Sequence, residues 1–543
     1  MRIDRKIILV LGLAALLTTV YSQEKLQYHL IRTDPNGFIL PWYDREPSVS
    51  YDHIVNLVWK FWDTMRVDLN GLPYYMNHQV WRPYYNDPRG IGGDQLAMAM
   101  ESWRLLYAYT GNEKIKENIQ FMADYYLSHS LSEPSDLWPN LPYPYNTLVY
   151  SGQYDGDMIL GKDFLQPDKA GSFGLELLVC YKMTAGEIYP NATKDLYLER
   201  AIQIANTLAS HVQPGLENQS PLPFKVNAKS GTVGILIPHG PNSADTLKSN
   251  YTTNWSGIME LWLQLMEMKR GNTGLYQKAL NALLSWMQEY PLQNNKWGPF
   301  FEDIPGWSDT QINAVTFAQF IMNHTHLFSD WKGKVARIFD WVYKELRNDK
   351  WITYGVIPIN EQTAYRVPGN SHTSRQAAAQ LQFAFQTGDT SYQSSSIRQL
   401  NWATYMVDRD GKNKYLQDEN WLTDGYGDYI RHYLKAMNYY PLAALPVTRL
   451  LHSTSVVQHA FYDGKPKYYF PFIKDYKNLE LHYSVFDENG EERIRMAKMP
   501  GRILFNGNSI DLSNTALVRW EPLRTGGVLT IYRKGVRQVS LYR

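Results

Sequence analysis

Apolar residues between Tyr51 and Asn438 recur at positions i, i+3, i+4 and i+7, which places them on one face of an α-helix. Turn residues such as glycine and asparagine close each periodic segment. The pattern predicts twelve helices, at Tyr51–Met65, Asp94–Tyr109, Glu113–Ser128, Ser172–Thr184, Asp195–His211, Asn254–Met268, Tyr276–Glu289, Asp309–Asn323, Trp331–Leu346, Thr373–Thr387, Tyr392–Val407 and Asp424–Asn438. We therefore expect a mainly α-helical region.

Short and long connections alternate between these helices. Thr110-Gly111-Asn112, Arg270-Gly271-Asn272 and Thr387-Gly388-Asp389 are glycine-containing stops that favour tight antiparallel hairpins. The long connections are Asn70–Gly93, Leu131–Gly171, Gln213–Thr253, Pro291–Ser308 and Asn348–His372. Loops of this length usually carry function. The alternation predicts an (α/α)6 toroid, a closed ring of six helical hairpins with a cleft on the loop-rich rim; an open solenoid is the alternative. In this prediction, Tyr51–Met65 is the first helix of a pair.

The pattern changes after Pro441 to short alternating segments rich in Tyr, Val, Ile and Phe. Examples are Lys467–Phe472, Leu479–Val485, Ala516–Trp520 and Val528–Tyr532, with turn signals at Asp487–Gly490 and Asn506–Asn508. This predicts a small C-terminal β-sandwich. The expected domains are an extension at 23–50 that packs on the ring, the toroid at 51–445 and the sandwich at 446–543.

The first 22 residues have the pattern of a secretory signal peptide. Arg2, Arg5 and Lys6 precede the apolar run Ile7–Val20, and small residues follow. The run is short for a membrane span, although an uncleaved anchor is the alternative. The only cysteine is Cys180, so no lipid-attachment cysteine follows the signal and no disulfide can form within the chain. We expect a periplasmic or secreted protein with no membrane span in its mature chain.

Composition favours a glycan partner. A formal net charge of +1 provides no basic surface for nucleic acid, so none is expected as a partner. Aromatic residues make up 14% of the chain, and many lie in the long loops. Their flat apolar faces and polar tips suit the faces and hydroxyl groups of sugars. The candidate platforms are Trp81, Tyr84, Tyr85, Trp138, Trp255 and Trp307. The alternative is that these rings pack the loops onto the ring of helices.

The paired helices, the single loop-rich rim, the signal peptide and the trailing β module together resemble the six-hairpin (α/α)6-toroid glycosidases, a superfamily with polysaccharide lyase relatives. The stretch Asp94-Gln95-Leu96-Ala97-Met98 is similar to the Asp-x-Leu-x-Met stretch of unsaturated glucuronyl hydrolases. The resemblance implies that Asp94 acts as general acid and base in a glycosidase.

Glycoside cleavage generally needs one carboxyl group that donates a proton and a second that is ionised. Asp94 follows Gly92-Gly93 and opens a predicted helix, so it is either a catalytic carboxylate or the helix N-cap. Asp303 lies between Phe301 and Trp307, whose apolar side chains would favour a protonated donor. The start of a helix lowers a carboxyl pKa, so these surroundings alone make Asp94 the ionised partner and Asp303 the acid.

Two further groups add candidates. Asp155 and Asp157 flank a glycine and fit catalysis, calcium binding or a plain turn; no metal site or cofactor is predicted. Guanidinium, imidazole and amide groups would bind the acidic group of a uronic acid. These candidates are Arg82, His239, Asn254 and Arg375, with His372 as a possible proton acceptor.

The sequence thus predicts a glycoside hydrolase that acts on an oligo- or polysaccharide containing uronic acid, by carboxylate general acid/base catalysis. A polysaccharide lyase that cleaves a uronate-containing chain by β-elimination is the first alternative. A noncatalytic glycan-binding protein with the same aromatic rim is the second.

Overall fold

The computed structural model describes most of the chain after residue 23. The described residues are 24–45, 47–65, 67, 71–76, 93–110, 112–148, 151–184, 191–236, 247–300, 307–413, 424–439, 449–454, 456–462, 465–466, 478–484, 489–522 and 526–543.

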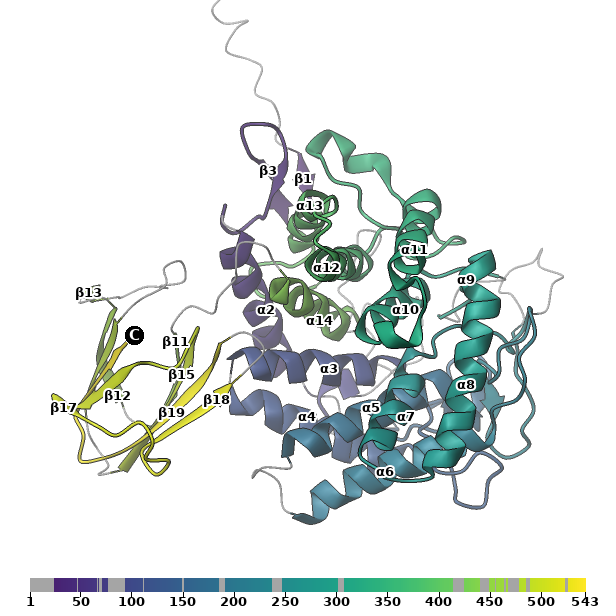
Figure 1. Ribbon diagram of the computed structural model, residues 1–543, viewed down its shortest axis with the longest axis horizontal. Coiled ribbons are helices and arrows are strands. Elements are labelled where there is room, and N and C mark those ends of the chain that lie inside the picture. Colours follow the sequence, from purple (N-terminus) through teal and green to yellow (C-terminus); the bar gives the residue numbers. More distant parts are fainter. Residues whose placement is uncertain are drawn as a thin grey trace, which may run out of the picture.

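Six helices form an inner ring in which each contacts its two neighbours (Figure 1). They are α3 (Gly93–Thr110), α5 (Pro167–Thr184), α7 (Ser256–Glu267), α10 (Gln311–Asn323), α12 (Asn370–Thr387) and α14 (Asp424–Asn438). Contacts between α14 and α3 close the circuit. A closed ring is therefore correct, and the open solenoid is excluded.

Six further helices cover the inner ring from outside. They are α2 (Pro47–Asp63), α4 (Glu113–His129), α6 (Asn191–Ser210), α8 (Thr273–Glu289), α11 (Trp331–Leu346) and α13 (Gln393–Thr404). From α4 to α13, each packs on the inner helix that precedes it in the chain, and α2 packs on α14. The hairpin that completes the toroid thus joins the first and last helices of the ring, and the predicted (α/α)6 architecture is confirmed.

Two helix assignments differ from the prediction. The helix containing Tyr51, α2, lies in the outer layer instead of beginning a pair, because it buries one face only. An inner helix is enclosed on all sides, as the buried stretch Asn370–Ala384 of α12 shows. Helix α5 begins at Pro167 and not at Ser172. Proline is favoured at the first helical position because its φ is already helical and its missing N–H would have no partner there.

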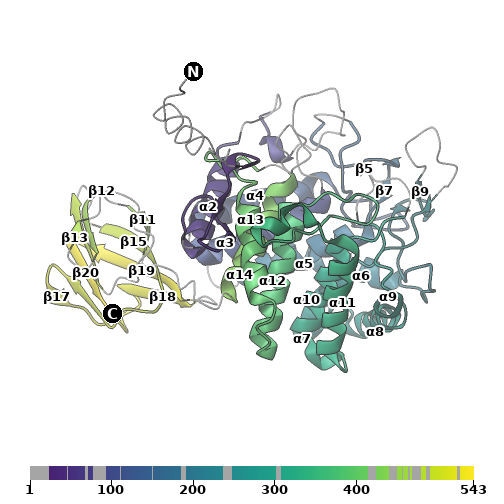
Figure 2. The same cartoon turned by 90° about the horizontal axis from the view of Figure 1, so that it is seen from above.

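The long connections enter the N-terminal ends of the inner helices and carry short strands. These are β5 (Gly156–Asp157), β6 (Gly161–Lys162), β7 (Phe164–Leu165), β8 (Val226–Asn227), β9 (Ile235–Leu236) and β10 (Leu247–Lys248). Figure 2 shows β5, β7 and β9 gathered along one side of the ring, which we call the loop face. The opposite side, where the inner helices end, we call the turn face. This agrees with the predicted placement of the long loops.

The C-terminal strands form two antiparallel sheets packed as a sandwich. One sheet has the order β11 (Arg449–Ser453), β15 (Asn489–Met496), β19 (Gly527–Lys534), β18 (Val518–Pro522). The other has the order β13 (Lys465–Pro466), β12 (Val456–Tyr462), β14 (Asn478–Ser484), β20 (Gln538–Tyr542), β16 (Arg502–Phe505), β17 (Asn508–Ser509). Apolar residues of both sheets, among them Leu481 and Leu529, form the core between them.

Three of the four predicted strands correspond to β14, β18 and β19, and 467–472 lies outside the described residues. The predicted turn at Asn506-Gly507 joins β16 to β17, and both residues have the positive φ that a two-residue hairpin turn requires. The predicted turn at 487–490 falls partly outside the described residues.

Three further contacts place the sandwich and the segment before α2. Arg495 of the sandwich donates a hydrogen bond to the Tyr109 carbonyl, and Arg493 forms an ion pair with Glu113 at the start of α4. In the segment that precedes α2, the carbonyl of Leu40 accepts a hydrogen bond from Tyr405. The exact domain limits stay predictions. No helix of the described residues has the length and apolar character needed to cross a membrane.

Candidate functional site

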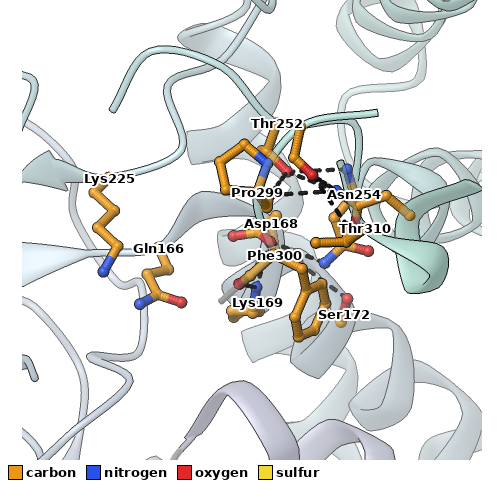
Figure 3. Close-up of polar contacts among 12 residues, drawn as sticks. Gln166, Asp168, Lys169, Ser172, Lys225, Thr252, Asn254, Pro299, Phe300 and Thr310 are labelled. Carbon is orange, nitrogen blue, oxygen red and sulfur yellow. Dashed lines mark hydrogen bonds and ion pairs between the residues drawn. The ribbon is translucent and has the colours of Figure 1, made fainter. Parts of the chain in front are cut away.

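Asp168 lies in the first turn of α5 and is the centre of a polar cluster on the loop side of the ring (Figure 3). Its side chain is 0% exposed. Its Oδ2 atom accepts hydrogen bonds from Lys169 Nζ at 2.7 Å and from Asn254 Nδ2 at 2.8 Å. Its Oδ1 atom has no hydrogen-bond partner among the described residues. A buried carboxylate oxygen without a partner is costly, and such atoms are found where a ligand or a reacting group binds.

Lys169 is held between the carboxylate and two aromatic rings. Its Nζ atom lies 3.5 Å from the Phe300 ring centre and 5.4 Å from that of Phe224, and it donates to the Phe300 carbonyl at 3.2 Å. The side chain is 4% exposed. Cation–π contact and the ion pair with Asp168 together compensate the burial of the ammonium group.

Asn254 is positioned by the segment that precedes α7. Its N–H donates to Thr252 Oγ1, and the Thr252 hydroxyl donates to the Pro299 carbonyl. Asn313 of α10 donates from Nδ2 to the carbonyls of residues 297, 298 and 299. These bonds fix the loop before α10 against the loop before α7, as the dashed lines in Figure 3 show. The Asp168 cluster is thus built on the rigid ends of three inner helices.

A cavity of about 480 Å³ begins at this cluster and follows the centre of the ring. Lys169, Asn254 and Phe300 line its buried end, where Met98, Phe300 and Ile312 form a small apolar cluster. Its other lining residues come from successive turns of the inner helices. In the last turns, Lys182 and Asn323 are exposed. The cavity therefore opens on the turn face.

Ion pairs between neighbouring inner helices line the middle of this cavity. Glu101 of α3 bonds to Arg431 at 2.7 Å and to Lys435 at 2.5 Å, both on α14, and Arg104 bonds to Glu176 of α5 at 3.1 Å. Burial alone would raise the pKa of Glu101, but the Lys435 and Arg431 charges lower it well below its usual value. Burial raises the pKa of Glu176, and Arg104 offsets only part of that effect. These pairs tie α3 to its two neighbours in the ring, α5 and α14.

Asp94 lies in the first turn of α3, which contacts α5. Asp94 and Asp168 therefore occupy equivalent positions at the N-terminal ends of two neighbouring inner helices. The Asp94 side chain falls outside what the structure describes. So do the predicted site residues Trp81, Arg82, Tyr84, Tyr85, His239 and Asp303. Their roles stay predictions.

Asp157 is not at this cluster. It lies on β5, is 0% exposed, and pairs with Lys225 at 2.7 Å. Backbone N–H groups of Ile159 and Leu160 and the Gln166 amide donate to the same carboxylate. The placement corrects the catalytic assignment, because both carboxylate oxygens are already engaged by the protein and the group anchors a loop. Its neighbour Asp155 accepts hydrogen bonds from Thr147. Among the described residues, no group of three or more His, Cys, Asp or Glu side chains could hold a metal ion.

Two predicted sugar platforms lie in the core. Trp255 is 0% exposed, and Trp138 is 5% exposed and stacks on His211 with ring centres 3.9 Å apart. An indole enclosed in this way has no free face for a sugar, so these two rings pack the loops onto the helices, as the alternative interpretation stated. Trp307 differs, since it is only partly buried and lines a second cavity.

His372 and Arg375 lie in the first turns of α12 and are buried. Arg375 Nη1 donates to Gln311 Oε1 at 2.7 Å, and Gln311 Nε2 donates to the His372 carbonyl at 3.1 Å. Arg375 is therefore an internal tie between α12 and α10 instead of a surface clamp for a sugar carboxylate. Neither residue lines the central cavity.

Asn254 is a predicted site residue, whereas Asp168 and Lys169 are not. The helix start expected at Ser172 places both of them in a loop. A usable signal was present, because Pro167 followed at once by an acidic residue after a long loop marks a helix start. The reasoning applied to Asp94 would have selected Asp168 as well.

No protein-family model matches the chain, and no curated protein matches it. Among solved structures, a sugar epimerase from a ruminal bacterium is similar with a TM-score of 0.52 and 12% identity, over 72% of this chain and 98% of that one. Cellobiose 2-epimerase from Spirochaeta thermophila has a TM-score of 0.51 and 11% identity, over 73% and 96%. A glycosyl hydrolase of family 88 from Bacteroides vulgatus has a TM-score of 0.44 and 10% identity, over 73% and 100%, and adds no argument. The two epimerases show that this chain has the toroid fold which the predicted resemblance implies.

Proposed function

We propose that the protein is a secreted or periplasmic glycoside hydrolase that acts on a glycan containing uronic acid, with Asp94 and Asp168 as its pair of carboxyl groups. The observation that carries the proposal is the buried Asp168 carboxylate, which is held through one oxygen and has no hydrogen-bond partner among the described residues at the other. The signal-peptide pattern of the first 22 residues supports export.

The hydrogen bonds assign different tasks to the two Asp168 oxygens. Lys169 Nζ and Asn254 Nδ2 are donors only, so Oδ2 must accept from both. Oδ1 is therefore the atom that binds a proton, a water molecule or the sugar. Asp168 is the ionised partner, which activates water or attacks the anomeric carbon. Asp94, at the equivalent position of α3, is the general acid that the resemblance implies.

The proposal is tested by incubating the protein with a panel of acidic glycans and following three products. New reducing ends report hydrolysis, absorbance of a 4,5-unsaturated uronate reports elimination, and deuterium uptake from heavy water without cleavage reports epimerisation. We expect reducing ends without an unsaturated product. Asp94→Asn and Asp168→Asn should each lower kcat by several orders of magnitude.

The matched control is Asp330→Asn. Asp330 is the N-cap of the outer helix α11, and asparagine caps a helix as well as aspartate does. This variant should keep full activity and stability. Formation of an unsaturated product would identify a lyase instead, and tight glycan binding without turnover would identify a noncatalytic binding protein. An Asp168→Asn protein with normal turnover would remove Asp168 from the reaction.

An epimerase is the second candidate. One observation favours it: the fold is similar to that of two sugar epimerases. The candidate base is His372, in the first turn of the inner helix α12. A histidine there could remove and return a proton beside a carbonyl group. Deuterium uptake that requires His372 and is unaffected in Asp94→Asn would establish this activity in place of hydrolysis.

A further inference from the structure

A second cavity of about 240 Å³ lies on the loop side of the ring, outside the Asp168 cluster. Its walls include Tyr251 and Trp307, whose ring centres are 5.0 Å apart, and the amide of Asn218. Lys248 and Lys296 also line it. Small-molecule sites generally begin at about 300 Å³, so a cavity of this size matches a single sugar ring.

The two lysines bring positive charge to this cavity. Burial and the nearby carboxylates of Asp309 and Glu217 raise the pKa of Tyr251, so negative charge also lies near the aromatic wall. Lys296 Nζ lies 4.5 Å from the Trp307 ring centre and 5.8 Å from that of Tyr251, and it donates to Asn218 Oδ1. No carboxylate of the described residues lies within ion-pair distance of Lys248 or Lys296. The nearby Asp309 is already bound by the N–H groups of residues 297 and 298 and by Trp307 Nε1. Both ammonium groups are therefore available to an anion.

A buried hydroxyl group adds to the site. Ser249 is 2% exposed and lines the same cavity, and its Oγ atom has no hydrogen-bond partner among the described residues. A hydroxyl group can both donate and accept, as a sugar hydroxyl can. The cavity thus combines an aromatic wall, two cations and an unused hydroxyl group.

The cavity shares a wall with the Asp168 cluster. Pro299 lines the cavity, and the carbonyl of the next residue, Phe300, accepts the hydrogen bond from Lys169. Phe224 also lines the cavity, and its ring centre is 5.4 Å from Lys169 Nζ. One layer of residues therefore separates this cavity from the Asp168 cluster.

We propose that this cavity is a subsite for one sugar ring that carries an anionic group, a carboxylate or a sulfate, beside the bond that reacts at Asp168. The anion binds Lys296 and Lys248, and the ring lies against the wall of Trp307 and Tyr251. The subsite rests on the proposed hydrolase for its place in the reaction, but the anion binding stands on its own contacts. It adds to that proposal the residues that distinguish an acidic glycan from a neutral one.

The test measures binding by calorimetry with the Asp168→Asn protein, which leaves the ligand intact. The probes are uronic-acid trisaccharides, their carboxyl-reduced counterparts and a sulfated neutral trisaccharide. We expect the acidic trisaccharide to bind at least about tenfold more tightly than the reduced one, and less tightly as salt rises. Comparable binding of the sulfated probe would show that the subsite reads charge alone; rejection of it would show a carboxylate-specific site. Both results support the subsite.

The variant Lys296→Met keeps the aliphatic chain and should abolish the preference for the acidic probe, whereas Lys296→Arg should retain it. Trp307→Ala should weaken binding of acidic and neutral probes alike. Lys278→Met, at an exposed lysine of the outer helix α8, is the matched control and should change nothing. Equal binding of acidic and reduced probes, or an unchanged dissociation constant in Lys296→Met, would overturn the subsite.

The two proposals fail in different ways. A preference for acidic probes without turnover of any glycan would leave the subsite standing and overturn the hydrolase. Reducing-end release at equal kcat/KM from acidic and neutral substrates would do the reverse.

Discussion

Asn254 Nδ2 donates a hydrogen bond of 2.8 Å to Asp168 Oδ2, across 86 residues of sequence. The bond joins the N-terminal ends of α7 and α5, two neighbours in the inner ring. It orients the Asp168 carboxylate so that Oδ1 faces away from the two donors, and it is the link between helix packing and the proposed chemistry.

Asn254→Ala should lower kcat by about tenfold to a hundredfold, since a hydrogen bond to a charged group contributes about 1.5–3 kcal/mol. KM should change little, because Asn254 positions Asp168 and does not hold the remote sugar. Steady-state kinetics on the substrate found by the glycan panel measures both constants.

Asn281→Ala is the control for that experiment. Asn281 is exposed on the outer helix α8, where it accepts a hydrogen bond from Gln277. Its loss should leave both kinetic constants as they are. If Asn254→Ala behaved in the same way, the amide would have no part in positioning Asp168.

Gly171→Ala should destabilise the ring. Gly171 is one turn after Asp168 on α5, and a Cβ atom there would lie 2.0 Å from Ile258 Cγ1 on α7. Overpacking of this kind costs about 1–3 kcal/mol, and the displaced helices should carry Asp168 and Asn254 apart. Urea unfolding gives the stability change, and kcat reports the site.

Two companion variants sharpen that result. Gly274→Ala, in the first turn of α8, meets nothing closer than 4.0 Å and should stabilise by about 0.4–1 kcal/mol through the unfolded state. Adding Ile258→Ala to Gly171→Ala should recover part of the lost activity by making room. Wild-type stability in Gly171→Ala would mean that α5 and α7 approach less closely than described.

Asp157→Asn should lower stability at neutral pH by about 3–5 kcal/mol, because the buried ion pair of Asp157 with Lys225 is lost. Burial alone would raise the pKa of Asp157, but Lys225 and the donated hydrogen bonds outweigh it and hold the pKa below its ordinary value. The unfolded chain therefore binds the proton more tightly. The stabilisation is present above the unfolded pKa of about 3.9 and is lost as pH falls through the folded pKa.

Urea unfolding as a function of pH tests this. Wild-type protein should lose stability below about pH 4, and Asp157→Asn should lose less over the same interval. Asp155→Asn is the neighbouring control, since Asp155 is only partly buried and bonds to Thr147. Its effect should be much smaller. Equal stability of Asp157→Asn and wild type would contradict the buried ion pair.

Cys180 should be inert towards thiol reagents while the ring is folded. Burial raises the pKa of its thiol, and the nearby Glu176 charge adds to the effect, so little thiolate exists at neutral pH. Since it is the only cysteine, one equivalent should react as α5 unfolds. A time course of labelling at increasing denaturant measures this, and rapid stoichiometric labelling of native protein would contradict it.

Local chemistry determined most of the secondary structure. The apolar period of a helix and the glycine stops depend only on nearby residues, and Gly388 ends α12 in the left-handed conformation that the stop at 387–389 predicts. The turn at Asn506-Gly507 and three of the predicted strands follow from the same kind of signal. These features, repeated along the chain, were sufficient to predict a toroid followed by a sandwich.

The tertiary structure decided which residues meet. Only ring closure shows that the first helix, α2, packs on the last, α14, and lies outside. Burial distinguishes the predicted aromatic platforms from one another: Trp255 lies in the core, whereas Trp307 lines a cavity. Asp157 and Asp168 look alike in the sequence. Lys225, 68 residues away, and nearby donors engage both oxygens of Asp157, whereas one oxygen of Asp168 has no hydrogen-bond partner among the described residues. The sequence fixes local conformation through neighbouring residues, whereas the pairing of buried charges depends on contacts that form only when the ring closes.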